Sequence, residues 1–284
     1  MADEKNHSSS PKPPNADSVS SQAREQYLKL FAQRWAAVTP PMRPSREELV
    51  RYEKAILGAK PRDGATALIL GATPELRSLA LKHRLETTGC DIDDGVWKAL
   101  TSLRTVEGEE DFIQGNWLNL PESRRYDFIL GDCSFNMLTW DEMQKLAAKV
   151  RALLKEDGVS IQRIQAAPES LTLESIGQAA AAYRRGGFKM SLYFYLIFLG
   201  EALRNLFRPE MNNREFFESV VFNYLTPDEA AQMRPALIDR KFGYPKWKDM
   251  LALLERHFTI IHEEKSTEPG IWDTASVFVL KRKP

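Results

Sequence analysis

The residues best placed to do chemistry are a glycine and an aspartate that each follow a predicted strand, Gly71 and Asp91. Gly71 ends the apolar run 67–70, and a helical pattern begins directly after it, which predicts a buried strand, a tight turn and an amphipathic helix. In a doubly wound fold, an acidic residue about 20 positions after such a turn accepts hydrogen bonds from a ribose. This spacing predicts a ligand-binding crevice at the ends of the two strands.

The turn after Gly71 also carries a helix start signal. Thr73 is a suitable N-cap residue, and Pro74 suits the first helical position because no N–H donor is needed there. The N–H groups of the first helical turn favour an anionic or carboxylate-bearing ligand. A structural interpretation stays open, in which Gly71 is an ordinary turn residue and Asp91 and Asp93 cap the next helix.

Composition limits the class of partner. The chain has 284 residues, of which 43% are hydrophobic and 27% charged, and its formal net charge is 0. It is long enough to bury a large core and has no overall charge bias toward nucleic acid or anionic membranes. We therefore expect a small-molecule substrate and no nucleic-acid or membrane partner. We also predict no metal site.

The cysteines and the N-terminus indicate a cytoplasmic protein. Cys90 and Cys133 both lie near predicted strand ends, which favours a reducing compartment over a disulfide framework. The N-terminus is polar and lacks an apolar signal segment, and the longest apolar run, residues 190–199, is about half the length that a membrane-spanning helix needs.

Polarity and proline positions divide the first part of the chain. Residues 1–21 are rich in Ser and Pro, which predicts a disordered tail. Residues 22–60 predict an N-terminal helical segment of two helices, and Ser45 with Glu48 fits a capping box at the start of the second helix.

The next part alternates strands and helices. Residues 61–167 predict repeated βα units and hence a parallel sheet with helices on both faces, with a turn at 156–158 before the strand 159–164. Residues 257–284 complete the same domain with two strand-like runs that predict an antiparallel pair at the sheet edge.

A long helical insertion separates these two parts. Residues 168–256 are too many for an ordinary loop, so we expect a helical substrate-binding unit that acts as a lid. Its aromatic segment, which includes Tyr193 and Tyr195, suits an apolar or aromatic substrate pocket. The alternative is a buried helix or a contact in a homodimer.

The order of these elements resembles the class I S-adenosylmethionine-dependent methyltransferases. The motifs that carry the resemblance are the Gly71 turn, the strand that ends in Asp91, then GNW, YDFILGD and LLKEDG, over about residues 65–159. The resemblance implies an α/β fold with a doubly wound, mainly parallel, seven-stranded Rossmann-like sheet and an antiparallel terminal strand. It also implies S-adenosyl-L-methionine as the cofactor.

The resemblance assigns roles to residues at three strand ends. It implies that the Gly71 loop faces the methionine part of the cofactor, that Asp91 holds the ribose, and that the segment after the third strand lies near the adenine. The family's acidic residue two positions before the first glycine is Ile69 in this chain, and its later loop glycines are Thr73 and Glu75. The expected cofactor-binding residues are Gly71, Ala72, Thr73, Asp91, Ile92, Asn116, Trp117, Asp132, Cys133 and Ser134.

We therefore predict a methyltransferase that acts on a small aromatic or carboxylate-bearing molecule, with O-methylation favoured. Arg163 and Lys189 are expected to hold a substrate anion, beside Tyr193 and Tyr195. None of the four histidines follows the fourth strand, so methyl transfer should depend on positioning, with Asp132 as the candidate general base.

Two other classes of protein stay open. An NAD(P)-dependent oxidoreductase would use the same strand order, but Thr73 and Glu75 suit a diphosphate poorly. A non-catalytic binding protein is the other alternative, because fold does not fix function.

Overall fold

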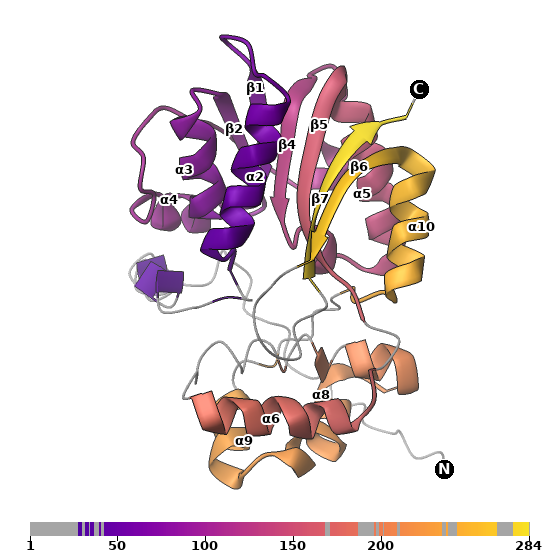
Figure 1. The fold of residues 1–284 in the computed structure, drawn as a ribbon. Helices are drawn as coiled ribbons and strands as arrows, with labels where there is room; N and C mark the ends of the chain where they lie inside the picture. Colours follow the sequence, from indigo (N-terminus) through magenta and orange to yellow (C-terminus); the bar gives the residue numbers. More distant parts are fainter. Residues whose placement is uncertain are drawn as a thin grey trace, which may run out of the picture.

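A sheet of seven strands, flanked by helices, has the strand order β3-β2-β1-β4-β5-β7-β6 (Figure 1). The computed structural model describes residues 28–29, 32–33, 35–36, 40, 43–167, 171–186, 196, 199–200, 202–208, 211–234, 237, 243–265 and 275–283. The strands are β1 (Thr66–Leu70), β2 (Glu86–Asp91), β3 (Asp111–Gln114), β4 (Tyr126–Asp132), β5 (Leu154–Gln165), β6 (Phe258–Lys265) and β7 (Ala275–Arg282).

The helices alternate with the strands and also fill the long insertion. The α-helices are α2 (Arg46–Gly58), α3 (Pro74–Lys82), α4 (Asp94–Thr101), α5 (Trp140–Leu153), α6 (Glu174–Gly186), α8 (Asn213–Ser219), α9 (Pro227–Met233) and α10 (Trp247–His257). Short 3-10 helices are η2 (Trp117–Asn119), η3 (Phe135–Met137) and η4 (Val221–Tyr224).

The strand pairing confirms the predicted mixed, doubly wound sheet. β1 pairs in parallel with β2 and β4, and the outer pairs β2–β3 and β4–β5 are also parallel. β7 runs antiparallel to both β5 and β6, as predicted for the terminal pair. Because β7 separates β5 from β6, the last strand in sequence lies inside the sheet and β6 forms its edge.

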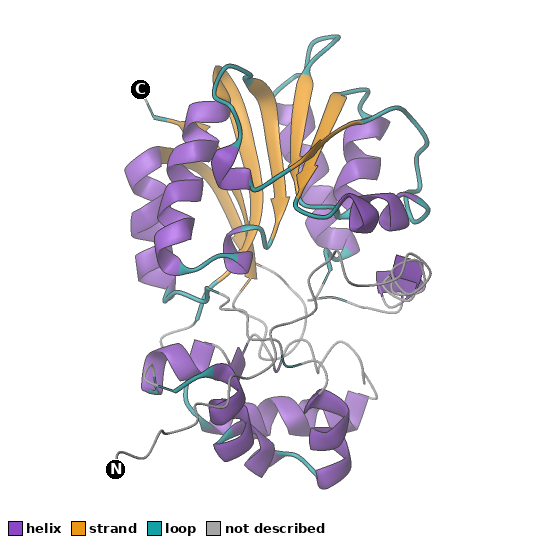
Figure 2. Cartoon of the chain, turned by 180° about the vertical axis from the view of Figure 1, so that it is seen from behind, coloured by secondary structure: helices purple, strands orange, loops and turns teal. Residues whose placement is uncertain are grey.

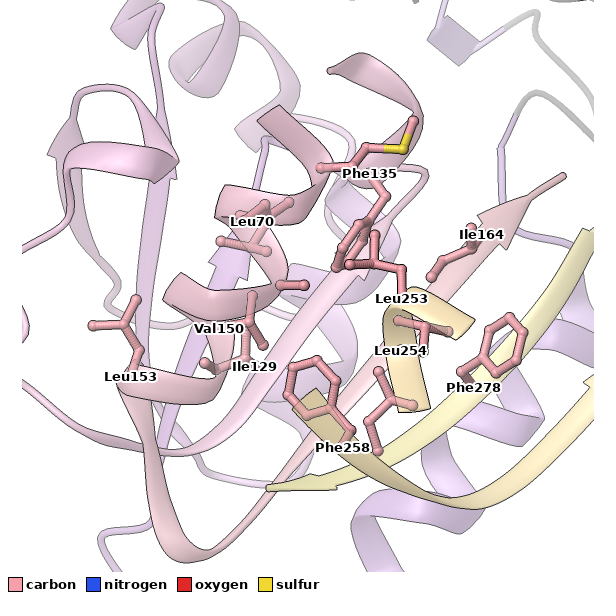
Figure 3. Close-up of a cluster of buried hydrophobic side chains, with 14 of the residues drawn as sticks. Leu70, Ile129, Phe135, Val150, Leu153, Ile164, Leu253, Leu254, Phe258 and Phe278 are labelled. Atoms are coloured by element: carbon pink, nitrogen blue, oxygen red, sulfur yellow. The ribbon is translucent and has the colours of Figure 1, made fainter. Parts of the chain in front are cut away.

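Alternate residues of β1 build two separate cores. Leu68 and Leu70 pack with α5 and α10 on one face, in the cluster that Figure 3 shows. Ala67 and Ile69 pack with α2 and α3 on the other face. The strand is therefore buried on both sides, which explains its continuous apolar sequence.

Helix α4 lies on the same side of the sheet as α3 and packs Trp97 against Gly89 of β2. A Cβ on residue 89 would lie 1.9 Å from the Trp97 ring, so only glycine fits at this position.

Most predicted element boundaries agree with the structure, and one turn differs. Ser45 and Glu48 form the expected capping box of α2, with Glu48 N–H donating to Ser45 Oγ at 3.1 Å and Ser45 N–H to Glu48 Oε2 at 2.8 Å. The turn predicted at 156–158 lies inside β5 instead. β4 pairs with Leu154 and then with Val159, so these residues form an irregularity within one strand.

The insertion has a core of its own. Side chains from α6, α8, η4 and α9 form a buried cluster that includes Ile176, Phe216, Phe217 and Met233. In Figure 2 these helices lie beyond the edge toward which the arrowheads of the parallel strands point. Helix α10 differs, because its residues Met250, Leu253 and Leu254 pack in the core of the sheet.

Asn136 connects the sheet to the segment that leads into α10. Its Nδ2 donates to Gln165 O at 2.7 Å and to Gly243 O at 3.0 Å, and its Oδ1 accepts from Gln165 N–H at 2.9 Å. Its side chain is fully buried, so these hydrogen bonds hold the loop after β4 in place.

Among the described residues, no helix is long and apolar enough to cross a membrane.

Several predicted features fall outside the described residues. These are the N-terminal tail 1–21 and the side chains Lys189, Tyr193 and Tyr195. Of the first predicted helix, only short stretches between 28 and 36 are described, and they are helical.

Candidate functional site

Gly71 forms a tight turn at the carboxyl end of β1. Its φ is +98°, a value that favours glycine, and its N–H donates to Cys90 O at 2.9 Å. A Cβ on Gly71 would lie 3.7 Å from Cζ2 of Trp117 and 3.9 Å from Oδ2 of Asp91. The turn, the carboxylate and the indole ring therefore lie close together at the carboxyl ends of β1 and β2.

Asp91 is held beside the Gly71 turn by the backbone that follows it. Its Oδ1 accepts the Asp93 N–H at 3.1 Å. Asp93 is the N-cap of α4 and accepts the N–H of Gly95 at 2.8 Å. The capping function proposed for both aspartates thus belongs to Asp93, while Asp91 lies beside Gly71. Ile92, the next residue, is 60% exposed and offers an apolar surface.

The segment after β3 supplies Trp117. Its Nε1–H donates to Cys90 O at 2.7 Å, which orients the ring toward the Gly71 turn. Asn116 is exposed, and its Oδ1 accepts the Leu118 N–H at 2.9 Å, so this amide caps η2. The three sequence-predicted residues that the structure brings together are thus Gly71, Asp91 and Trp117.

Ala72 and Thr73 are more buried than the other loop residues. Ala72 packs with Trp97 and Leu100, below the loop. Thr73 occupies the N-cap position of α3, but its side chain accepts no capping hydrogen bond from the described first turn. The predicted N-cap position of Thr73 and the predicted first helical position of Pro74 are therefore correct, and only the capping hydrogen bond of the threonine hydroxyl is absent.

The residues that follow β4 stabilise the turn at its end. Ser134 is 1% exposed, and its Oγ donates to Leu70 O at 2.9 Å. Cys133 has a φ of +52°, and its N–H donates to Arg163 O at 2.9 Å. Burial raises the pKa of the Cys133 thiol well above its ordinary value, so the thiol stays protonated. These two residues join the ends of β1, β4 and β5.

A buried charged network lies behind this edge and centres on Arg163. Its Nε lies 2.6 Å from Asp132 Oδ1, and its Nη1 lies 3.7 Å from Glu48 Oε1 on α2. The Arg163 side chain is 1% exposed and engages protein carboxylates, which contradicts the predicted contact with a substrate anion. A substrate carboxylate would have to displace a buried aspartate to reach this guanidinium.

Tyr52 completes the network from α2. Its hydroxyl donates to Gly131 O at 2.7 Å and accepts the Arg163 N–H at 2.7 Å. Burial raises the pKa of Tyr52 well above its ordinary value. Burial also raises the pKa of Asp132; the Arg163 guanidinium opposes this effect, and the carboxylates of Glu48 and Glu75 add to it.

The sequence analysis did not assign Glu48 or Tyr52 to the site. They lie four residues apart on one face of α2, so both reach the same place. A buried tyrosine hydroxyl needs a hydrogen-bond partner, and this need is the signal that could have identified Tyr52.

The described histidines lie away from the carboxyl edge. His83 is the C-cap residue of α3, and its Nε2 lies 2.9 Å from Glu53 Oε1. His257 ends α10 immediately before β6 begins, and His262 lies on β6 beside Glu264. None of these three imidazoles lies beside the Gly71 turn. Among the residues that the structure describes, no group of three or more Asp, Glu, His or Cys side chains could hold a metal ion.

Two cavities lie elsewhere. One, of about 530 Å³, lies between α5 and α10 and is lined by Trp140, Met143, Lys246 and Leu253 among others. The other, of about 660 Å³, is lined by residues of α4 and of the described stretches near residue 30. Neither is lined by Gly71, Asp91 or Trp117.

The sheet order defines the class of fold. The usual dinucleotide-binding sheet has the order 3-2-1-4-5-6, whereas this sheet inserts an antiparallel β7 between β5 and β6. This is the Rossmann-like fold of the class I S-adenosylmethionine-dependent methyltransferases, and solved structures of that class match the chain. The predicted resemblance is confirmed at the level of the fold.

Three solved structures that match over 92% of this chain are informative. The N-methyltransferase NodS from Bradyrhizobium japonicum WM9, in complex with S-adenosyl-L-homocysteine, is 10% identical, with a TM-score of 0.53 over 99% of its own chain. Magnesium protoporphyrin IX methyltransferase ChlM from Synechocystis PCC 6803, with bound S-adenosylhomocysteine, is 12% identical, with a TM-score of 0.51 over 98% of its chain.

The third structure is a Rhodobacter sphaeroides protein described as a candidate Zn-dependent alcohol dehydrogenase. It is 16% identical, with a TM-score of 0.62 over 98% of its chain. At such low sequence identities, the structural similarity shows only that these proteins share a fold with this chain. No protein-family model matches the chain, and no curated protein matches its sequence.

Replacing Arg163 by methionine tests the buried network. Arg163→Met leaves Asp132 and Glu48 buried without their cation, and breaking a buried pair in this way costs about 3 to 5 kcal/mol of unfolding free energy. Urea unfolding measures this loss. The matched control is Arg234→Met, which removes an exposed pair with Glu218 and should cost far less. Equal losses for the two variants would show that Arg163 is not the centre of a buried network.

Proposed function

We propose that the protein is an S-adenosylmethionine-dependent methyltransferase that acts on a small molecule. The observation that carries this proposal is the proximity of Gly71, Asp91 and Trp117 at the carboxyl edge of the sheet. The methyltransferase fold, and matching structures that hold S-adenosylhomocysteine, support it.

The residues present fit a nucleoside at this position. Asp91 would accept hydrogen bonds from the ribose hydroxyls, as the acidic residue at this place does in doubly wound folds. Ile92 and Trp117 would form apolar walls for the adenine. Asn116 would contribute its Nδ2, since its Oδ1 already accepts the Leu118 N–H.

When bound, S-adenosylmethionine would supply a methyl group that its sulfonium already activates. The protein must then chiefly orient the acceptor, and orientation can lower a barrier by about 7 to 11 kcal/mol in favourable cases. The absence of an imidazole beside the Gly71 turn, among the described histidines, agrees with this account. Asp132 is the candidate base, because it is the carboxylate at the end of β4.

We further propose that the acceptor is aromatic or carries a carboxylate and is methylated on oxygen, in the cytoplasm. The balanced charge of the chain and the aromatic residues of the insertion support this choice. Lys189, Tyr193 and Tyr195 are the side chains that we propose for the acceptor.

An NAD(P)-dependent oxidoreductase is the second candidate, and the Rhodobacter sphaeroides neighbour favours it. Two features oppose it. Glu75 places a carboxylate in the first turn of α3, where a diphosphate would need backbone N–H donors. The antiparallel β7 also departs from the usual dinucleotide-binding sheet.

Calorimetry with S-adenosylhomocysteine tests the cofactor assignment. We expect the wild-type protein to bind it, and Asp91→Ala to weaken binding roughly ten-fold or more, because a hydrogen bond to a charged group contributes about 1.5 to 3 kcal/mol. Asp94→Ala is the matched control, since it removes a nearby aspartate that pairs with Lys98 on the outer face of α4. Binding of NADH or NADPH instead of S-adenosylhomocysteine would reject the methyltransferase in favour of the second candidate.

The pH dependence of methyl transfer separates positioning from base catalysis. Single turnovers would use radiolabelled methyl donor and a series of phenols and carboxylic acids with different pKa values. If positioning dominates, the midpoint of the pH profile follows the pKa of each acceptor, and the rate rises as the acceptor ionises. If Asp132 is the base, every acceptor shows one midpoint, and the rate falls as pH drops through the raised pKa of that carboxyl. A hundred-fold loss in Asp132→Asn would also contradict the positioning account.

A further inference from the structure

The cavity of about 530 Å³ between α5 and α10 is separate from the proposed cofactor site. These two helices pack side by side on one face of the sheet (Figure 1). The cavity is lined by the start of α5, by residues 243–246 with one face of α10, and by residues 204–206 of the insertion. Small-molecule sites usually measure about 300 to 1,000 Å³, so this cavity is large enough for a small organic ligand.

Much of the cavity wall is apolar or aromatic. Met143 of α5 and Leu253 of α10 are buried side chains that line it, and Leu206 lines it from the insertion. Tyr244 is also buried, whereas Trp140, the first residue of α5, is 39% exposed. Walls of this kind suit the aromatic or alkyl body of a ligand.

The charged side chains of the cavity wall are mainly basic. Arg204, Lys246 and Arg256 are cations, and Asp249 is the one acidic side chain among the described lining residues. Within the described part of the chain, Lys246, Asp249 and Arg256 form no ion pair. Asp249 lies in the first turn of α10, where an acidic side chain stabilises the start of a helix. The cavity therefore carries excess positive charge, and Lys246 and Arg256 keep donors for a ligand.

The two lysine and arginine cations of α10 face the cavity from different heights of the helix. Lys246 is the N-cap residue, and Arg256 lies ten residues later, about 15 Å along the helix axis. A helical side chain leans toward the N-terminus of its helix, so the Arg256 guanidinium is directed back along α10. A ligand that lies along this helix can therefore reach one cation or the other with a single anionic group.

Hydrogen bonds hold the walls of the cavity in place. Ala167 N–H donates to Pro245 O at 2.8 Å, and Trp247 N–H donates to Ala167 O at 3.1 Å, so the segment before α10 is fixed to the end of β5. In the insertion, Arg204 Nη1 donates to Met211 O at 2.9 Å. The cavity is thus formed before any ligand enters, which favours binding because little has to be ordered.

We infer that this cavity binds an organic anion with an aromatic or alkyl body, such as a hydrophobic carboxylate. The body lies against the apolar walls, and the anionic group accepts hydrogen bonds from Lys246 or Arg256. Such a ligand touches the insertion and both helices, so it fastens the insertion to the sheet. The inference goes beyond the proposed function and does not depend on it, because the Gly71 turn does not line the cavity.

A gap filled only by solvent makes a different prediction. Such a gap would bind no organic probe, or it would take apolar probes regardless of their charge. A basic ligand site binds an anion more tightly than a neutral molecule of the same shape, and this preference disappears when its cations are removed.

The test compares 2-naphthoate with 2-naphthamide, which keeps the ring system but has no charge. Calorimetry on the full chain should show naphthoate binding about ten-fold more tightly than naphthamide. The double variant Lys246→Gln with Arg256→Gln should weaken naphthoate about ten-fold and change naphthamide less than about two-fold. The two single variants identify which cation holds the carboxylate. Trp140→Ala should weaken both probes by a similar factor, because it removes part of the aromatic wall.

A matched double variant controls for the change in net charge. Lys145→Gln with Lys248→Gln removes two exposed lysines from α5 and α10 that do not line the cavity, and it should leave both probes unchanged. Equal losses of naphthoate affinity in the two double variants would show a long-range charge effect and refute the site. Equal affinities of the two probes for the wild-type protein, or no binding of either, would refute it as well.

Competition with S-adenosylhomocysteine separates this inference from the proposed function. Naphthoate should bind with the same affinity to protein saturated with S-adenosylhomocysteine. Displacement of one by the other would place the probe at the cofactor site and refute a separate site. If S-adenosylhomocysteine does not bind at all, the proposed function fails, while the comparison of naphthoate with naphthamide still decides this inference.

Discussion

The burial of one guanidinium, that of Arg163, is the constraint on which the carboxyl edge of the sheet depends. Its charge is enclosed by Asp132 at the end of β4 and by Glu48 on α2, and its backbone N–H donates to the Tyr52 hydroxyl. Because a buried charge is tolerated only with its partners in place, β4, β5 and α2 are fixed relative to one another. The loop after β4 and the start of α2 therefore approach the turn after β1.

The two sides of the carboxyl edge of the sheet differ in structure. On the β4–β5 side, buried charges pair with one another, whereas the β1–β2 side carries the Gly71 turn, whose φ is positive. Arg43, three residues before the first residue of α2, forms an ion pair with Glu75 of α3.

The sequence predicted the sheet well because its signals are local. Buried strands, βα turns and capping boxes such as Ser45–Glu48 depend on neighbouring residues, and the Gly71–Asp91 spacing reflects one βα unit. The role of Arg163 was predicted incorrectly, because its partners are distant in sequence; the Tyr52 contact spans 111 residues. Glu75 was recognised only as an obstacle to a diphosphate, since nothing local reveals that Arg43 faces it.

A crystal structure of the protein with S-adenosylhomocysteine tests the central claim most directly. The account predicts that the ribose hydroxyls lie within hydrogen-bond distance of the Asp91 carboxylate, with the adenine beside Ile92 and Trp117. Occupation of the cavity of about 530 Å³ between α5 and α10, with Asp91 left without ligand contact, would contradict it.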